Sequence, residues 1–189
     1  MKKTYELIIK TAEKLFYRTG FSSVGVDEIR DMSGCSKTTL YNHFGSKDKL
    51  IVEVLKHRDS IFRSKLVNSI TGLNGKNAIL GIFKWHKKWF SEVDYNGCLF
   101  MRAVEEMRET LPCVSDILKE HKEFVRGLIY SKLEDYSDKE SLTNKLMVIL
   151  EGLINIGVEY KNDKNLNDQI EQDAINLVLE LLDRNSVGK

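Results

Sequence analysis

The side chains between Lys37 and Lys47 are of types that contact DNA. Lysine, threonine, tyrosine, asparagine and histidine donate hydrogen bonds to phosphates, and several of them also meet base edges in the major groove. Leu40 and Phe44 lie four residues apart and can share the buried face of one helix. The opposite, outer side of that helix then carries six polar residues: Lys37, Thr38, Thr39, Tyr41, Asn42 and His43.

Two short helices and a turn must position these side chains. The pattern VDEIRDMSGCSKTTLYNHF predicts helices over 26–33 and 37–44, separated by Gly34-Cys35-Ser36, which is the arrangement of a helix-turn-helix. Gly34 supplies the left-handed backbone that the turn needs. The helix expected over 4–19 supports the motif with an apolar face made of Leu7, Ile8, Thr11, Ala12, Leu15 and Phe16.

The 3.6-residue period recurs along the rest of the chain, so we expect an all-α protein. Ser46 is placed to cap a long helix over about 47–70, which Gly72 ends. The remaining helices are expected over about 76–91, 98–110, 112–134, 142–160 and 166–182, with Pro112 in a first turn. This makes about nine helices.

Charge is unevenly distributed along the 189 residues. Residues 1–65 hold 13 basic and 8 acidic side chains, a net charge of +5, whereas residues 66–189 hold 16 and 20, a net charge of −4. The basic part is the candidate for a polyanionic partner. Charged residues interrupt the apolar stretches, which excludes a membrane span and argues against a signal peptide.

The three cysteines, Cys35, Cys98 and Cys113, are odd in number and lack close spacing. They therefore argue against a disulfide framework and a zinc site and favour a reducing cytoplasm. We expect no metal and no cofactor. Scattered Glu and His without catalytic spacing also argue against an enzyme.

The stretch GFSSVGVDEIRDMSGCSKTTLYNHFGSKDKL is similar to the DNA-binding domain of the tetracycline-repressor (TetR) family of transcription regulators. The resemblance covers roughly residues 4–55 and is most specific in the run from Tyr41 to Lys47. It implies a DNA-binding domain over 1–46 and an all-α ligand-binding and dimerisation domain over 47–189. It further implies base contacts from Lys37, Thr38 and Thr39 and phosphate contacts from Tyr41, His43 and Lys47. Two residues depart from the family pattern, Gly25 and Arg30; Arg30 must point outward.

The second domain offers candidates for a small-molecule effector. Aromatic and sulfur-containing residues can line an apolar pocket, although they also suit an ordinary core. The candidate ligand-binding residues are Trp85, Trp89, Cys98, Met101 and Phe124. Gly97-Cys98 resembles a helix start in relatives that sense electrophiles or oxidants, since a thiol at a helix N-terminus is a better nucleophile. The alternative is a small buried side chain.

The last two helices predict a homodimer. Their apolar residues suit a two-fold four-helix interface: Leu146, Ile149, Leu150, Leu153, Ile156, Gly157, Tyr160, Ile170, Ala174, Leu177, Val178 and Leu181. We therefore expect a cytoplasmic repressor that binds a palindromic operator in double-stranded DNA and is released by a small molecule or oxidant. A helical adaptor that binds only protein is the alternative.

Overall fold

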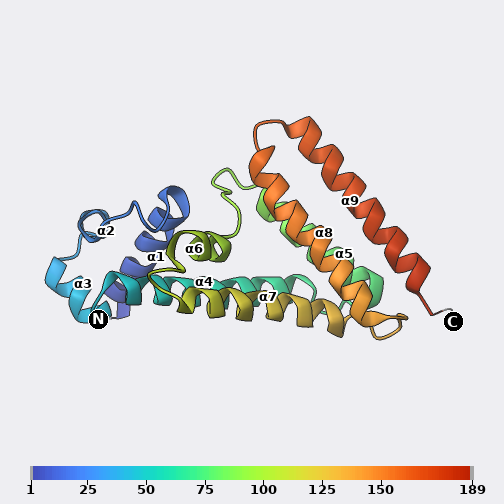
Figure 1. The fold of residues 1–189 in the computed structure, drawn as a ribbon, viewed down its shortest axis with the longest axis horizontal. Helices are drawn as coiled ribbons and strands as arrows, with labels where there is room; N and C mark the ends of the chain where they lie inside the picture. Colours follow the sequence, from blue (N-terminus) through green and yellow to red (C-terminus); the bar gives the residue numbers. More distant parts are fainter. Residues whose placement is uncertain (1, 188–189) are drawn as a thin grey trace. The chain divides into compact units, whose positions relative to one another are not determined.

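The computed structural model describes residues 2–187, which form nine α-helices (Figure 1). The expected all-α fold is therefore confirmed. The first three expected helices match within two residues, and the later ones differ at their ends by up to three. The helices are α1 (Lys2–Thr19), α2 (Val26–Ser33), α3 (Lys37–Phe44), α4 (Lys47–Ser69), α5 (Gly75–Phe90), α6 (Leu99–Met107), α7 (Cys113–Ser131), α8 (Lys139–Glu159) and α9 (Lys164–Asn185).

The helix ends follow the capping residues. The Ser46 hydroxyl accepts a hydrogen bond from the Lys49 N–H at 3.1 Å, and Gly20, Gly34 and Gly72 all adopt positive φ. Pro112 lies directly before α7 instead of in its first turn. A shift of one residue is common at helix ends, and the missing N–H of proline is tolerated at either position.

Packing divides the chain into two compact units. Unit 1 comprises the chain up to Arg63 together with Cys98–His121, and unit 2 comprises Ser64–Gly97 and the chain from Lys122 onward. Helix α6 thus packs with the N-terminal helices, so packing groups the residues differently from the expected division after residue 46. That division concerns function and stays a prediction.

The core of unit 1 joins α1 to the helix-turn-helix. Ile8, Phe16, Ile29, Leu40 and Leu50 are fully buried in one apolar cluster. Leu7, which we expected on the apolar face of α1, is 50% exposed, whereas Ile9 is buried. The expectation for Leu7 was wrong because the face of α1 that packs is centred on Ala12, and Leu7 lies on the opposite side.

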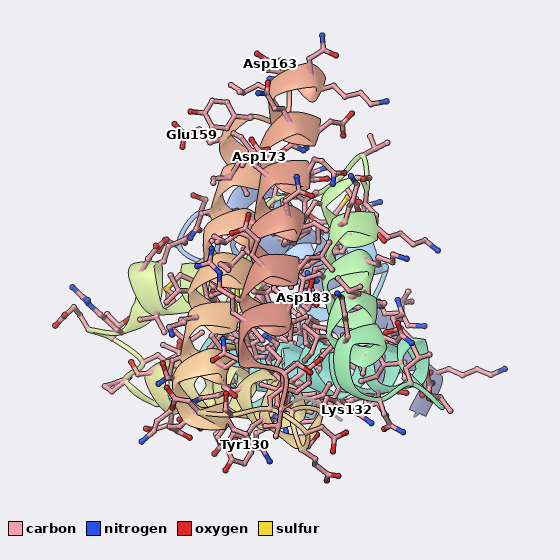
Figure 2. The ribbon with its side chains drawn as sticks, turned by 90° about the vertical axis from the view of Figure 1, so that its right-hand side faces the viewer. Tyr130, Lys132, Glu159, Asp163, Asp173 and Asp183 are labelled. Atoms are coloured by element: carbon pink, nitrogen blue, oxygen red, sulfur yellow. The ribbon has the colours of Figure 1, made fainter. Side chains whose placement is uncertain are left out.

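Unit 2 is built on α5, α8 and α9, which lie side by side (Figures 1 and 2). The Tyr95 hydroxyl donates to the Ile154 carbonyl at 2.6 Å, and a Cβ on Gly157 would lie 3.2 Å from the Tyr95 ring. Five residues that we expected in a dimer interface are instead buried in the protomer: Leu146, Leu150, Leu153, Gly157 and Val178. Apolar side chains cover so much of the circumference of α8 that one side of the helix packs against neighbouring helices of the same protomer.

Helix α8 is also, within the described residues, the one helix long and apolar enough to cross a membrane by length and composition. The mean hydropathy of its most apolar 18-residue stretch is 1.2, a value that the core helices of soluble proteins also reach. Leu146 and Leu150 on α8 are fully buried, the helix contacts α5 and α9, and 39% of the apolar stretch is buried inside the protein.

Candidate nucleic-acid interface

The turn between α2 and α3 is stabilised by local hydrogen bonds. Gly34 adopts φ 65° and ends α2, and its N–H donates to the Asp31 carbonyl. Ser36 caps α3, since its hydroxyl accepts from the Thr39 N–H at 3.0 Å. A cap of this kind typically stabilises a helix by about 1 kcal/mol, which matters for a helix of eight residues.

Helix α3 presents the polar face that the sequence predicts. Leu40 and Phe44 are buried, and four of the six polar residues are exposed: Lys37, Thr38, Tyr41 and Asn42. Thr39 and His43 are half-buried. The Thr39 hydroxyl lies 2.8 Å from that of Ser36, and the His43 ring packs edge-on against Tyr5 of α1. The exposed four are therefore the side chains best presented to a duplex.

Two cations of the helix-turn-helix are paired with acids of α2. Lys37 lies 3.1 Å from Asp27, and its hydrogen bond holds the pKa of that carboxyl below the ordinary value. Arg30 bonds both Asp27 and Asp31, so it points to the surface as expected. The motif consequently carries less free positive charge than its sequence indicates.

Lys47 has a partner that the sequence did not indicate. Its ammonium donates to the Phe21 carbonyl at 2.6 Å, and burial lowers the pKa of Lys47. An ammonium group has three donors, so this bond leaves two for other acceptors. Lys47 therefore ties the start of α4 to the connection between α1 and α2.

The same connection is held from α6 by residues that sequence reasoning missed. The Glu106 carboxylate accepts from the Ser22 N–H at 2.9 Å and from Arg102 at 2.8 Å, and Arg102 also donates to the Tyr17 carbonyl. Burial would raise the pKa of Glu106, but the hydrogen bonds from Ser22 and Arg102 outweigh it and hold the pKa below its ordinary value. No local pattern could have indicated contacts between residues 84 positions apart.

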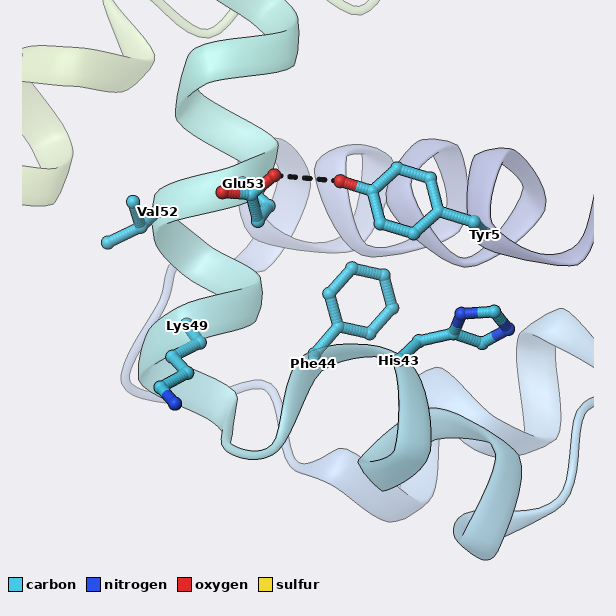
Figure 3. A pocket seen from close by; sticks show the side chains of 6 residues that line it. All are labelled: Tyr5, His43, Phe44, Lys49, Val52 and Glu53. Carbon is cyan, nitrogen blue, oxygen red and sulfur yellow. Dashed lines mark hydrogen bonds between the residues drawn. The ribbon is translucent and has the colours of Figure 1, made fainter. Parts of the chain in front are cut away.

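A pocket of about 290 Å³ lies where α1, α3 and α4 meet (Figure 3). Tyr5, His43, Phe44, Lys49, Val52 and Glu53 line it. The Tyr5 hydroxyl donates to Glu53 at 2.8 Å, and burial together with this bond raises the pKa of Tyr5 to about 12. This hydrogen bond attaches the first turns of α1 to α4.

The five candidate ligand-binding residues fall in both units. In unit 2, Trp85 and Trp89 are half-buried on α5 with ring centroids 6.4 Å apart, and Phe124 is half-buried on α7. In unit 1, Cys98 directly precedes α6, makes no side-chain cap hydrogen bond and packs against the core, while Met101 is 37% exposed. The structure thus brings the two tryptophans together. Among the described residues, no three His, Cys, Asp or Glu side chains form a metal-binding group.

Comparisons with known proteins agree with this geometry. The family model for bacterial regulatory proteins of the tetR family matches residues 8–54. The transposon Tn10 TetC protein of Escherichia coli is 23% identical over 175 residues, covering 89% of this chain and 85% of that protein. The crystal structure of SCO4454, a TetR-family transcriptional regulator from Streptomyces coelicolor, superposes with a TM-score of 0.87 at 20% identity, covering 98% of this chain and 97% of that one.

Shorter matches are confined to part of the chain. The transcriptional repressor NicS of Pseudomonas putida is 34% identical over 55 residues, 29% of this chain and 26% of that protein. The transcriptional activator FasR of Mycolicibacterium smegmatis is 40% identical over 55 residues, 29% of this chain and 25% of that protein. The chain thus spans about a quarter of the length of these two relatives. The family model describes regulatory proteins, and SCO4454, NicS and FasR are transcriptional regulators, not enzymes.

Proposed function

We propose that this chain, which matches the tetR family of bacterial regulatory proteins over residues 8–54 and has the fold of a TetR-family regulator, is a homodimeric, cytoplasmic repressor of transcription. It binds a palindromic operator through α3 and is released by a small molecule or an oxidant. The observation that carries the proposal is the exposed polar face of α3, held on a fully buried core by Leu40.

The operator contacts are assigned to the residues predicted from the sequence. Lys37, Thr38 and Thr39 meet bases, and Tyr41, His43 and Lys47 hold the phosphates and fix the register of the helix, while Asn42 makes a further DNA contact. The support is the exposure of Lys37, Thr38, Tyr41 and Asn42. A contact from Lys47 adds to its bond with Phe21, because the ammonium has donors to spare.

Dimerisation is assigned to the outer faces of α8 and α9, which face the viewer in Figure 2. Val148 is 73% exposed and Leu177 is 46% exposed, so both side chains are accessible to a second copy. Small residues lie beside them: Gly152, where an added Cβ would meet open space, and the half-buried Ala174. A second copy related by a two-fold axis would bury these faces and set two recognition helices about 34 Å apart.

The effector acts by preferring one of two conformers. A molecule bound in the domain over 47–189 weakens DNA binding only as far as its affinity differs between the conformer that fits the operator and one that does not. A coupling of about 1 to 3 kcal/mol changes operator affinity roughly 5- to 150-fold. The half-buried aromatic pair Trp85 and Trp89 supports an apolar or aromatic effector.

Selection of binding sites from random duplex DNA tests the proposal. The purified protein should enrich a palindrome, and a reporter placed behind that palindrome should be less active when the protein is present. Increased reporter activity would assign activation instead. No enrichment at low and moderate salt, with protein partners captured instead, would favour the adaptor.

Thr38→Ala should change which operators are preferred. The Thr38 side chain is exposed beside the cap of α3, and its loss removes a contact to one base edge in each half-site, worth about 1 to 3 kcal/mol of discrimination. Binding competition among single-base variants of the selected palindrome measures this, with the exposed Thr71→Ala as control. An equal loss of affinity on every sequence would exclude a base-reading role.

Cys98→Ser should abolish release by oxidants while leaving DNA binding intact. Cys98 is half-buried at the start of α6, so a bulkier oxidised sulfur there must move that helix end. The assay compares operator binding before and after treatment with hydrogen peroxide, with Cys113→Ser, which removes an exposed thiol, as control. Release that persists in Cys98→Ser would leave only the small-molecule route.

A further inference from the structure

Four cations of unit 1 that lack an ion pair lie on α1. On α2, α3 and α4, most cations of the unit are paired with nearby acids: Arg30, Lys37, Lys56, Arg58 and Arg63. Among the described residues, by contrast, no acid lies within 4.0 Å of the charged groups of Lys3, Lys10, Lys14 or Arg18. Helix α1 therefore carries four cations without an ion pair.

These four cations occupy one face of that helix. Together with Leu7 they follow each other at intervals of three or four residues, so they form a single stripe along α1, here called the α1 stripe. All five side chains are exposed, and the stripe lies opposite the buried residues Ile8, Ala12 and Leu15. At 1.5 Å per residue it is about 22 Å long.

The stripe begins beside the recognition helix. Tyr5, in the first turns of α1, stacks on Phe44 with ring centroids 5.0 Å apart and meets His43 edge-on (Figure 3). Lys3, at the near end of the stripe, is therefore two residues from a contact with α3. From there the stripe runs along the whole of α1 to Arg18.

We propose that the α1 stripe is a second, sequence-independent contact surface for duplex DNA, engaged by DNA that flanks the palindrome. This rests on the proposed function. The complementary partner of four unpaired cations in a row is a polyanion, and duplex DNA carries one negative charge per about 1.7 Å of its length. Within α3, Lys37 adds less to this attraction because it is paired with Asp27.

Duplex length provides the test. Affinity is measured for a duplex of about 20 base pairs that holds only the selected palindrome, and for one of about 60 base pairs with the palindrome at its centre. The variant is Lys10→Gln with Lys14→Gln. The control is Lys84→Gln with Lys88→Gln, which removes the same charge at the same spacing from exposed positions of α5.

Loss of two phosphate contacts should lower the affinity of the Lys10/Lys14 variant for the long duplex roughly tenfold at moderate salt. The slope of log K against log salt should fall by about 2. Affinity for the short duplex should be unchanged, which separates this inference from operator reading. The control should match the wild type on both duplexes, and Lys10→Arg with Lys14→Arg should retain the long-duplex affinity, since charge and not lysine is required.

Three results would overturn the inference. Unchanged affinity for the long duplex would exclude flanking contacts. An equal loss on both duplexes would place the lysines within the operator contact. Binding to vesicles of anionic phospholipid that the variant loses, with long-duplex binding unchanged, would assign the stripe to a membrane surface. A thermal unfolding midpoint equal to that of the wild type would show that the Lys10/Lys14 variant is folded.

Discussion

Val148→Glu combined with Leu177→Glu should make the protein monomeric and lower its affinity for the palindrome at least about 100-fold. Both side chains are exposed in the protomer, at 73% and 46%, so the substitutions leave its core intact. In the proposed dimer each new carboxylate would be buried without a partner, which costs several kcal/mol. Monomers that bind the two half-sites independently lose the gain in affinity, about 10²- to 10⁴-fold, that a dimer obtains by binding both half-sites at once.

Sedimentation equilibrium and operator titration measure the two effects together. Val93→Glu is the matched control, because Val93 is 94% exposed in the connection between α5 and α6 and lies on neither α8 nor α9. It should remain dimeric with wild-type affinity. A dimeric double variant that still binds the palindrome would refute the assignment of the interface to these faces.

Glu106→Ala should lower the free energy of unfolding by about 2 to 3 kcal/mol at neutral pH. The carboxylate, 23% exposed, accepts charge-assisted hydrogen bonds from the Ser22 N–H and from Arg102, and bonds of this kind contribute about 1.5 to 3 kcal/mol. Its loss removes the hydrogen bond by which α6 holds the Ser22 N–H of the connection between α1 and α2. Operator affinity should fall as well, because this connection positions α2.

The loss of unfolding free energy in Glu106→Ala should depend on pH in a defined direction. The pKa of Glu106 is held below its ordinary value of 4.5 in the folded protein, so its contribution is complete above that value and is lost as pH falls through the lower folded pKa. Wild type and variant should therefore converge in acid. Denaturant unfolding at several pH values measures this, with Glu109→Ala as control, since the Glu109 side chain is 88% exposed. A deficit independent of pH would mean that the carboxylate charge contributes nothing.

Several features of the fold were predictable from short stretches of sequence. The helix-turn-helix, the left-handed Gly34 and the cap at Ser46 depend on backbone geometry within one or two turns, and all three are found in the structure. The polar face of α3 follows from the positions of Leu40 and Phe44 alone.

The predictions that were wrong concern which face of a helix is buried and which residues are in contact. Leu7 was expected in the core and is half-exposed, and Leu146 and Leu150 were expected in an interface and are core. Periodicity shows that a helix has an apolar side, but the side that packs depends on which helices lie next to it. The residues that hold the motif, such as Glu106, come from distant parts of the chain and carried no local signal.

The sequence by itself therefore determined the helices, their ends and the types of side chain offered to DNA, because each of these depends on residues a few positions apart. Only the tertiary structure decided which charges are free. It pairs Lys37 with Asp27 and engages Lys47 at the Phe21 carbonyl, while leaving Lys3, Lys10, Lys14 and Arg18, among the described side chains, without an ion pair. The physical reason is that an ion pair or hydrogen bond depends on distance in space, which only the packing of the helices sets.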